Sequence, residues 1–154
     1  MFGWSAEFMA DMFNIYPDKG VLFGEEEIEQ KARVVVIGSK VEDELFGDES
    51  ALGETIKIRD HNFRVVGVFP EYGQVMFFNI DDLVMMPYST AQTYLLGIDH
   101  YHEVMMRINN PENIDRAVFD IELTLRKRHN INDPEDDEYY IKAQQGIVHQ
   151  IWTI

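Results

Sequence analysis

The chain has 154 residues, of which 45% are hydrophobic and 12% aromatic, a globular composition with room for one domain or two small lobes. Its formal net charge of −15 makes nucleic acid and anionic membrane surfaces poor partners, because both are bound through Lys and Arg. It contains no cysteine, which excludes disulfides, thiolate metal sites and cysteine nucleophiles.

The chain begins with two short predicted helices. Residues 4–13 are predicted to form a helix capped by Ser5, and residues 24–31 a single acidic helical turn. A β-branched run over residues 33–38 then predicts a buried strand that ends at Gly38.

The next stretch predicts a short helix and a tight turn. Ser39 is expected to cap a helix over residues 40–46, and Gly47 to end it in the left-handed conformation. Gly53 is expected to form a turn before the following strand. The acidic residues between the two glycines argue against phosphate binding there.

A hairpin and a loop follow. Residues 54–58 and 63–70 alternate between apolar and polar side chains, which predicts two strands with one wet face. Gly67 within the second strand indicates a bulge or a close backbone approach. Residues 71–82 read as an exposed loop with an apolar tip formed by Val75, Met76, Phe77 and Phe78.

The rest of the chain predicts strands alternating with helices. Residues 83–87 form a strand stopped by Pro87, and Ser89 with Gln92 would form a capping box for a helix closed by Gly97. Further on we expect a strand (103–108), a helix with an apolar stripe that Asn110 caps, and a strand (139–143).

The order of these elements predicts an α+β fold in two lobes. A mixed α/β lobe with a strand–helix–strand unit would comprise residues 1–31 and 99–154, and a β-rich lobe, residues 32–98, would be inserted in it.

No catalytic constellation stands out. A metal ion could be held by Asp99, His100 and His102, but no further ligand lies nearby in the sequence. The pattern is more typical of polar residues on an edge strand. The loop around residues 132–138 resembles a calcium loop only in charge, since Asp137 stands where that motif needs glycine. Paired carboxylates for hydrolysis stay open because acidic residues are abundant. No cofactor is predicted.

The apolar tip is the main candidate contact site. Its side chains (Val75, Met76, Phe77 and Phe78) would meet a partner if exposed, or fold back onto the core of the lobe.

An ordered series of short motifs resembles a known family. The series contains a strand ending in Gly38, the Leu-Phe-Gly of residues 45–47, Gly-Glu-Thr-Ile at 53–56, Val-Val-Gly-Val at 65–68, and Met-Pro-Tyr-Ser-Thr at 86–90. It is similar to the extracytoplasmic core domain of MacB-type and FtsX-like ABC-transporter permeases, over roughly residues 20–148. The motif residues that carry the likeness are Gly38, Leu45, Phe46, Gly47, Gly53, Gly67 and Pro87.

The resemblance implies a porter-like mixed lobe with an inserted β-rich lobe, and a mixed lobe that lacks its early N-terminal elements. It implies an extracytoplasmic domain without enzymatic activity, anchored by transmembrane helices outside this chain. Its partners would be the membrane-embedded remainder of the permease and its ATPase, with an adaptor protein or an exported substrate. The isolated domain would be a monomer and the parent a dimer. Two other functions stay open: a secreted interaction domain, and an acid- or metal-dependent hydrolase.

Overall fold

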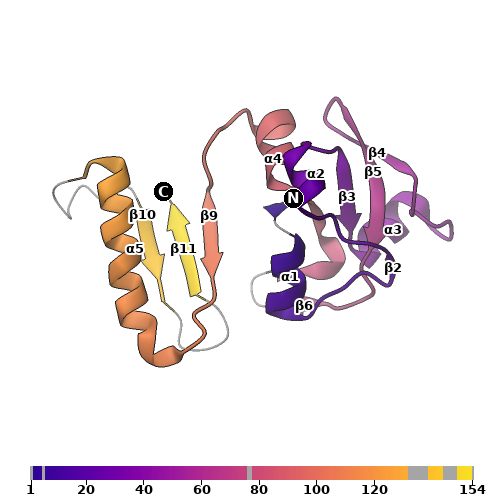
Figure 1. Ribbon diagram of the computed structural model, residues 1–154. Helices are drawn as coiled ribbons and strands as arrows, with labels where there is room; N and C mark the ends of the chain where they lie inside the picture. The colour runs from indigo at the N-terminus through magenta and orange to yellow at the C-terminus, as the bar shows by residue number, and fades with distance from the viewer. Residues whose placement is uncertain (1, 5, 76–77, 132–138, 144–148, 154) are drawn as a thin grey trace. The chain divides into compact units, whose positions relative to one another are not determined.

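The computed structural model describes residues 2–4, 6–75, 78–131, 139–143 and 149–153. The chain divides into two compact units, Met1–Asp99 and His100–Ile154 (Figure 1). Both contain helices and sheets, so the predicted α+β class is confirmed. Among the described residues, no helix is both long and apolar enough to cross a membrane.

The first unit is built on a six-stranded mixed sheet. Its path runs β1-β8-β3-β5-β2, and β4 pairs with β5 beside that path. The pairs β1–β8 and β3–β5 are parallel, and the others are antiparallel. The strands are β1 (Phe2–Trp4), β2 (Lys19–Gly20), β3 (Val34–Ile37), β4 (Thr55–Ile58), β5 (His61–Val68) and β8 (Val84–Pro87).

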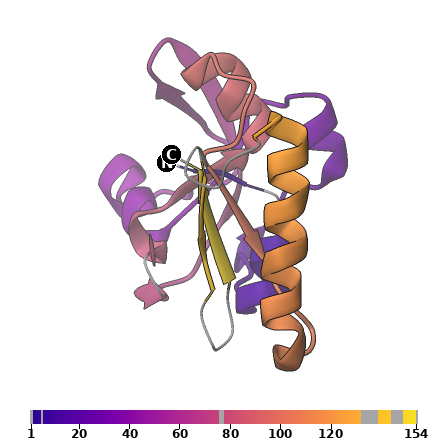
Figure 2. The ribbon, with the colours of Figure 1, turned by 90° about the vertical axis from the view of Figure 1, so that its left-hand side faces the viewer.

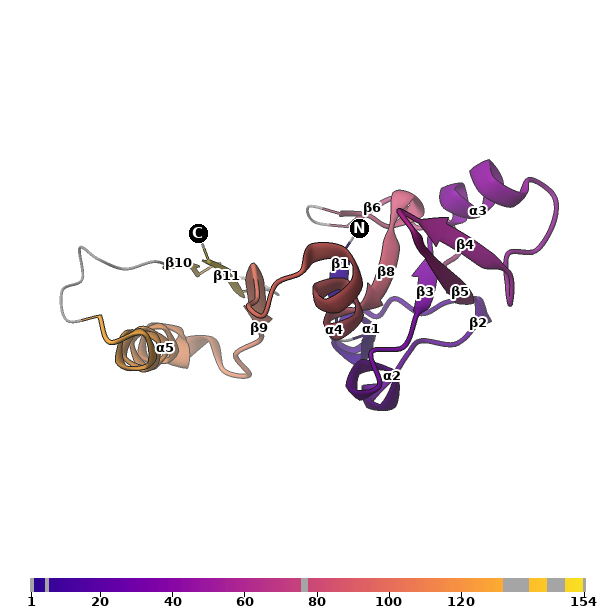
Figure 3. The ribbon, with the colours of Figure 1, turned by 90° about the horizontal axis from the view of Figure 1, so that it is seen from above.

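This sheet has an apolar core on each face. Alternation along β3 sends Val35 and Ile37 into one core and Val36 into the other, as a strand buried on both faces requires. The first core is completed by α3 (Ser39–Phe46) and by α4 (Tyr88–Thr90), which continues as a π-helix, Ala91–Leu96. The second is completed by α1 (Ala6–Phe13), α2 (Glu25–Glu29) and the 3₁₀ turn η1 (Ile80–Asp82). Figure 3 shows α3 on one side of the sheet and α1 and α2 on the other.

The register of β5 shifts beside Gly67. Val35 pairs with Val65, but Val36 pairs with Gly67, so one residue of β5 is skipped. A Cβ atom on Gly67 would lie 2.5 Å from the carbonyl oxygen of Val21. The bulge and the close backbone approach therefore occur at the same residue.

The second unit is a three-stranded antiparallel sheet covered by one helix. The order β10-β11-β9 leaves the two outer strands parallel, with α5 as the crossover between them (Figure 2). Asn110 caps the start, since its side chain accepts from the Glu112 N–H at 3.0 Å. The elements are β9 (Glu103–Met106), η3 (Pro111–Asn113), α5 (Ile114–His129), β10 (Tyr139–Lys142) and β11 (His149–Thr153).

The apolar stripe of α5 packs on this sheet. Ile114, Val118 and Ile121 face Met106 and Ile141 around a space of only about 10 Å³. The Tyr139 hydroxyl also donates to the Glu122 carbonyl at 3.2 Å. The predicted strand–helix–strand is thus present, and β11, which was not predicted, lies between its two strands.

Three local predictions were wrong at helix starts. The first helix begins at Ala6 rather than Trp4, because Phe2–Trp4 pair with β8; Ser5 lies outside the described residues. Gly38, not Ser39, is the N-cap of α3. The predicted capping box at Ser89 and Gln92 is absent, because Ser89 lies inside α4 and its hydroxyl donates to the carbonyl of Ile28 in α2.

The two units can be compared with the two predicted lobes. The boundary at Asp99 lies beside the predicted end of the inserted lobe. Residues 1–31, which were expected to belong with 99–154, supply β1 and β2 to the sheet of the first unit. The grouping of 1–31 with 99–154 into a porter-like lobe stays a prediction.

Candidate functional site

The predicted apolar tip belongs to a small hairpin. β6 (Gln74–Val75) pairs antiparallel with β7 (Phe78–Asn79), with Val75 opposite Phe78. Both of these side chains are half-buried and pack against the second core. Met76 and Phe77 lie outside the described residues, so a projecting contact site at the tip stays a prediction.

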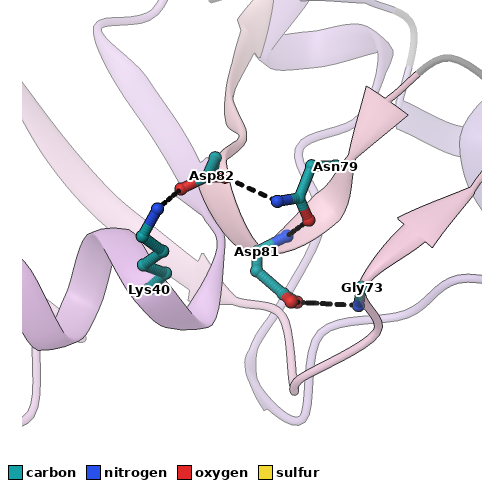
Figure 4. Close-up of polar contacts among 5 residues, drawn as sticks. All are labelled: Lys40, Gly73, Asn79, Asp81 and Asp82. Atoms are coloured by element: carbon teal, nitrogen blue, oxygen red, sulfur yellow. Dashed lines mark hydrogen bonds and ion pairs between the residues drawn. The ribbon is translucent and has the colours of Figure 1, made fainter.

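Asp81 ties the base of this hairpin together. Its carboxylate accepts the backbone N–H of Tyr72 at 2.8 Å. It also accepts the N–H of Gly73 at 3.0 and 3.1 Å (Figure 4). These hydrogen bonds, together with one from the hydroxyl of Ser39 and the nearby charge of Lys40, lower the pKa of Asp81, because they stabilise the ionised form. The chain entering the hairpin is therefore held by the chain leaving it.

Two further polar contacts extend from this base to α3. The Asn79 side chain accepts from the Asp81 N–H at 3.3 Å and donates to the Asp82 carboxylate. Lys40 of α3 forms an ion pair with Asp82 at 2.7 Å (Figure 4). Both side chains of that pair are about half exposed, so solvent screens the ion pair and it adds little to stability.

Gly38 lets the β3–α3 turn lie directly against η1. A Cβ atom there would be 2.2 Å from the carbonyl oxygen of Ile80 and 2.3 Å from that of Asp81. The Gly38 N–H also donates to the Leu83 carbonyl at 2.8 Å. Any larger residue would push the base of the hairpin away from the sheet.

The other motif residues lie at the opposite end of α3 and along the sheet. Phe46 is half-buried, whereas Leu45 remains 58% exposed. Gly47 ends α3 with φ 60° and ψ −123°, so the predicted left-handed conformation is wrong in ψ. Gly53 donates its N–H to the Val65 carbonyl at 2.8 Å, and Pro87 is the buried last residue of β8.

One residue with a clear structural role was not recognised as such in the sequence. Glu42 lies in the first turn of α3, where the helix dipole favours an acidic residue. It is 7% exposed, accepts the Ala51 N–H at 3.0 Å and pairs with Lys19 at 2.7 Å. Burial acts to raise the pKa of Glu42, but the hydrogen bonds from Lys19 and Ala51 outweigh it and lower that pKa. Its spacing of four residues from Phe46, which packs against the first core, was the available signal.

The candidate metal ligands form no site among the described residues. The rings of His100 and His102 meet edge-on, with centroids 5.5 Å apart, but the described part of the chain holds no group of three or more metal-binding side chains. The calcium-like loop, 132–138, falls outside that part. Burial raises the pKa of Glu103 in β9, and no described residue donates a hydrogen bond to its Oε1.

Comparison with known proteins identifies the family. The model of the MacB-like periplasmic core domain matches residues 1–123, most of the chain. The chain belongs to the MacB-like periplasmic core domain family.

Relatives of this family support the same assignment. The "Macrolide export ATP-binding/permease protein MacB" of Chlorobaculum tepidum is 36% identical over 126 residues, 82% of this chain and 19% of that protein. The protein of the same name from Bdellovibrio bacteriovorus is 36% identical over 115 residues, 75% of this chain and 18% of that protein. The chain thus spans about a fifth of the length of the curated relatives it matches.

Two solved structures share the fold. The extracellular domain of the noncanonic ABC-type transporter YknZ from Gram-positive bacteria aligns with a TM-score of 0.70 at 20% identity, over 83% of this chain and 63% of that one. The periplasmic region of MacB from Actinobacillus actinomycetemcomitans aligns with a TM-score of 0.59 at 22% identity, over 81% of this chain and 55% of that one.

Proposed function

We propose that this chain is the extracytoplasmic domain of an ABC-transporter permease, and that it couples cytoplasmic ATP hydrolysis to export or mechanical work outside the membrane. The match of the MacB-like periplasmic core domain to residues 1–123 carries the proposal. ATP hydrolysis would belong to a separate domain or subunit. The parent would be anchored by transmembrane helices and would act as a dimer.

The division of the chain into two units supports a mechanical role. Each unit has its own apolar packing, and the division falls between Asp99 and His100. Compact bodies joined by a short connection can move relative to one another without unfolding, as in hinge and shear motions. In the parent transporter such a movement would follow the ATPase cycle.

This chain contains no cysteine, so labels can be placed in its two units without first removing native thiols from them. Glu25 on α2 and Lys127 on α5 are exposed, one in each unit. In the reconstituted parent transporter we would replace both with spin-labelled cysteines and measure the distance distribution with and without ATP. A distribution that changes with the nucleotide is the expected result. An unchanged distribution in a transporter that hydrolyses ATP and exports its substrate would contradict coupling through these units.

We further propose that the apolar tip is a contact site for an adaptor protein or an exported substrate. Phe77→Ser is expected to reduce transport by the parent while leaving the thermal stability of the domain unchanged. Tyr72→Ser, which removes a 41% exposed aromatic side chain near the base of the same hairpin, is the matched control. A loss of stability in Phe77→Ser would instead indicate a side chain folded onto the core.

A further inference from the structure

A groove between α3 and β4 is not used by the hairpin site. It has a volume of about 380 Å³ and opens to solvent. Apolar side chains provide most of its wall, and the most exposed of them is Leu45, at 58%. The lining residues are Val41, Leu45, Phe46, Ile56, Ile58 and Val84, with Thr55 and Lys57 along one side.

The backbone of β4 has a free edge at this groove. Among the described residues β4 pairs only with β5, in a hairpin with two residues, Arg59 and Asp60, in its loop. Ile58 lies opposite His61 beside this loop, which makes them a hydrogen-bonded pair. Pairs alternate along an antiparallel ladder, so Thr55 and Lys57 turn their N–H and C=O groups away from β5. No described residue bonds to these groups.

The chain around the groove is strongly acidic. Residues 41–56, which supply five of its eight lining residues, contain no Lys or Arg. The charged side chain in the lining itself is Lys57, and the carboxylates of residues 41–56 lie beside the lining residues in the sequence. Glu42 is buried and already paired, but the remaining carboxylates of this segment are exposed. They are Asp43, Glu44, Asp48, Glu49 and Glu54.

We propose that this groove binds an extended peptide segment of a partner protein, which adds a strand to the free edge of β4. The segment would place alternate apolar side chains against Leu45 and Phe46 and carry Lys or Arg at its ends. Strand addition uses main-chain hydrogen bonds for affinity and side-chain pockets for specificity, and β4 offers both. The basic ends would match the exposed carboxylates of the segment 43–54, which adjoins the lining residues in the sequence.

The proposal also accounts for Lys57. Its side chain is exposed, and β alternation turns it to the face opposite Ile56 and Ile58. A lysine on a sheet edge commonly discourages unwanted pairing between molecules. Here it would reject a strand with a basic residue opposite it, so the central polar positions of the bound segment should be neutral or acidic.

This inference rests on the proposed function only in naming the kind of partner segment that a permease domain would bind. The test therefore uses the 154-residue chain alone, without the transporter. The probe is an acetylated and amidated peptide with Val-Thr-Val-Thr-Val between two lysines at each end. The control peptide carries glutamates in place of the lysines. Affinity is measured by titration calorimetry, and the site by amide exchange.

We expect the lysine peptide to bind and to slow exchange at Thr55 and Lys57, and the glutamate peptide not to bind. Leu45→Asp is expected to weaken binding at least tenfold, although it adds negative charge. If the attraction were purely electrostatic, the added negative charge would strengthen binding of the lysine peptide. Equal or tighter binding by Leu45→Asp would therefore overturn the proposal. Absence of binding, or protection elsewhere in the chain, would also overturn it.

Two further tests separate the contribution of the strand edge from that of the acidic segment 43–54. Thr55→Pro removes one outward N–H at the first residue of an edge strand, where proline is tolerated, and should also weaken binding. The pair Asp48→Asn and Glu49→Gln should weaken binding severalfold. The charge-matched pair Glu25→Gln and Glu29→Gln, on α2, should not. Equal effects of the two pairs would count against the groove. Failure of these binding tests would not affect the proposed ATP-dependent movement of the units, which the spin-label distance measurement tests separately.

Discussion

At the scale of single residues, the requirement for glycine at position 47 comes from the backbone conformation alone. Its φ of 60° combined with ψ of −123° lies outside the left-handed helical region, and is accessible in practice only to glycine. A Cβ atom there would meet no other atom within 4 Å, so any cost of a substitution comes from the backbone.

Gly47→Val is expected to lower the free energy of unfolding by about 1–3 kcal/mol, the usual cost of forcing a side chain into such a region. Gly47→Asn should cost nearly as much, because asparagine tolerates only the left-handed helical region. Chemical denaturation measures both. Gly97, with φ 63° and ψ 34°, provides the control, and Gly97→Asn should be tolerated. Equal tolerance of asparagine at the two glycines would contradict the assigned ψ of Gly47.

Glu42 should make stability depend on pH. Its pKa in the folded state is lowered from an ordinary value of 4.5. Its ionised form therefore stabilises the fold above that value, and this stabilisation is lost as the pH falls through the folded-state pKa. Glu42→Gln is expected to cost about 1–2 kcal/mol at pH 7 and progressively less on acidification.

Denaturant unfolding of the two proteins between pH 7 and pH 3 would measure this difference. Glu44→Gln, on the exposed side of α3, is the matched control and should change stability little at any pH. A Glu42→Gln deficit that stays constant down to pH 3 would show that ionisation of Glu42 does not contribute.

At the scale of elements, the β6–β7 hairpin is held mainly by its base. The hairpin has only two paired residues in each strand, and so short a ribbon is marginal by itself. Asp81 adds hydrogen bonds to the chain that enters the hairpin, and the half-buried Val75 and Phe78 add apolar contact.

Asp81→Ala is therefore expected to speed amide exchange at Tyr72 and Gly73 by tenfold or more, with little effect on β3 or β5. Hydrogen exchange followed by NMR measures this locally. Lys40→Ala removes only the exposed ion pair with Asp82 and should leave the same amides nearly unchanged. Unaltered exchange in Asp81→Ala would mean that the apolar contacts suffice.

At the scale of the whole molecule, both large cores belong to the first unit. Every described member of the two clusters lies before residue 100. A chain ending at Asp99 should therefore unfold cooperatively, with a single transition in urea reported equally by circular dichroism and by fluorescence. A broad, non-cooperative transition would show that the second unit is needed for the fold of the first.

Elements whose signal is local could be predicted from the amino-acid pattern alone. The β-branched run before Gly38 predicted a buried strand, and the apolar stripe after Asn110 predicted α5. The ordered motifs from Gly38 to Pro87 were enough to predict the family, because they record turns and helix ends in chain order. For the candidate site, the apolar run from Val75 to Phe78 predicted the tip, but nothing in the sequence predicted the hydrogen bonds of Asp81 that hold its base.

Contacts between residues far apart in the chain could not be predicted in this way. Phe2–Trp4 extend the sheet because β8 offers a free edge, and Ser89 bonds to the carbonyl of Ile28 rather than capping its own helix. The carboxylates of Asp81 and Glu42 accept hydrogen bonds from the N–H groups of Gly73 and Ala51, eight and nine residues away. Periodicity and capping signals act within a few residues, whereas these contacts depend on which chain segments packing brings together.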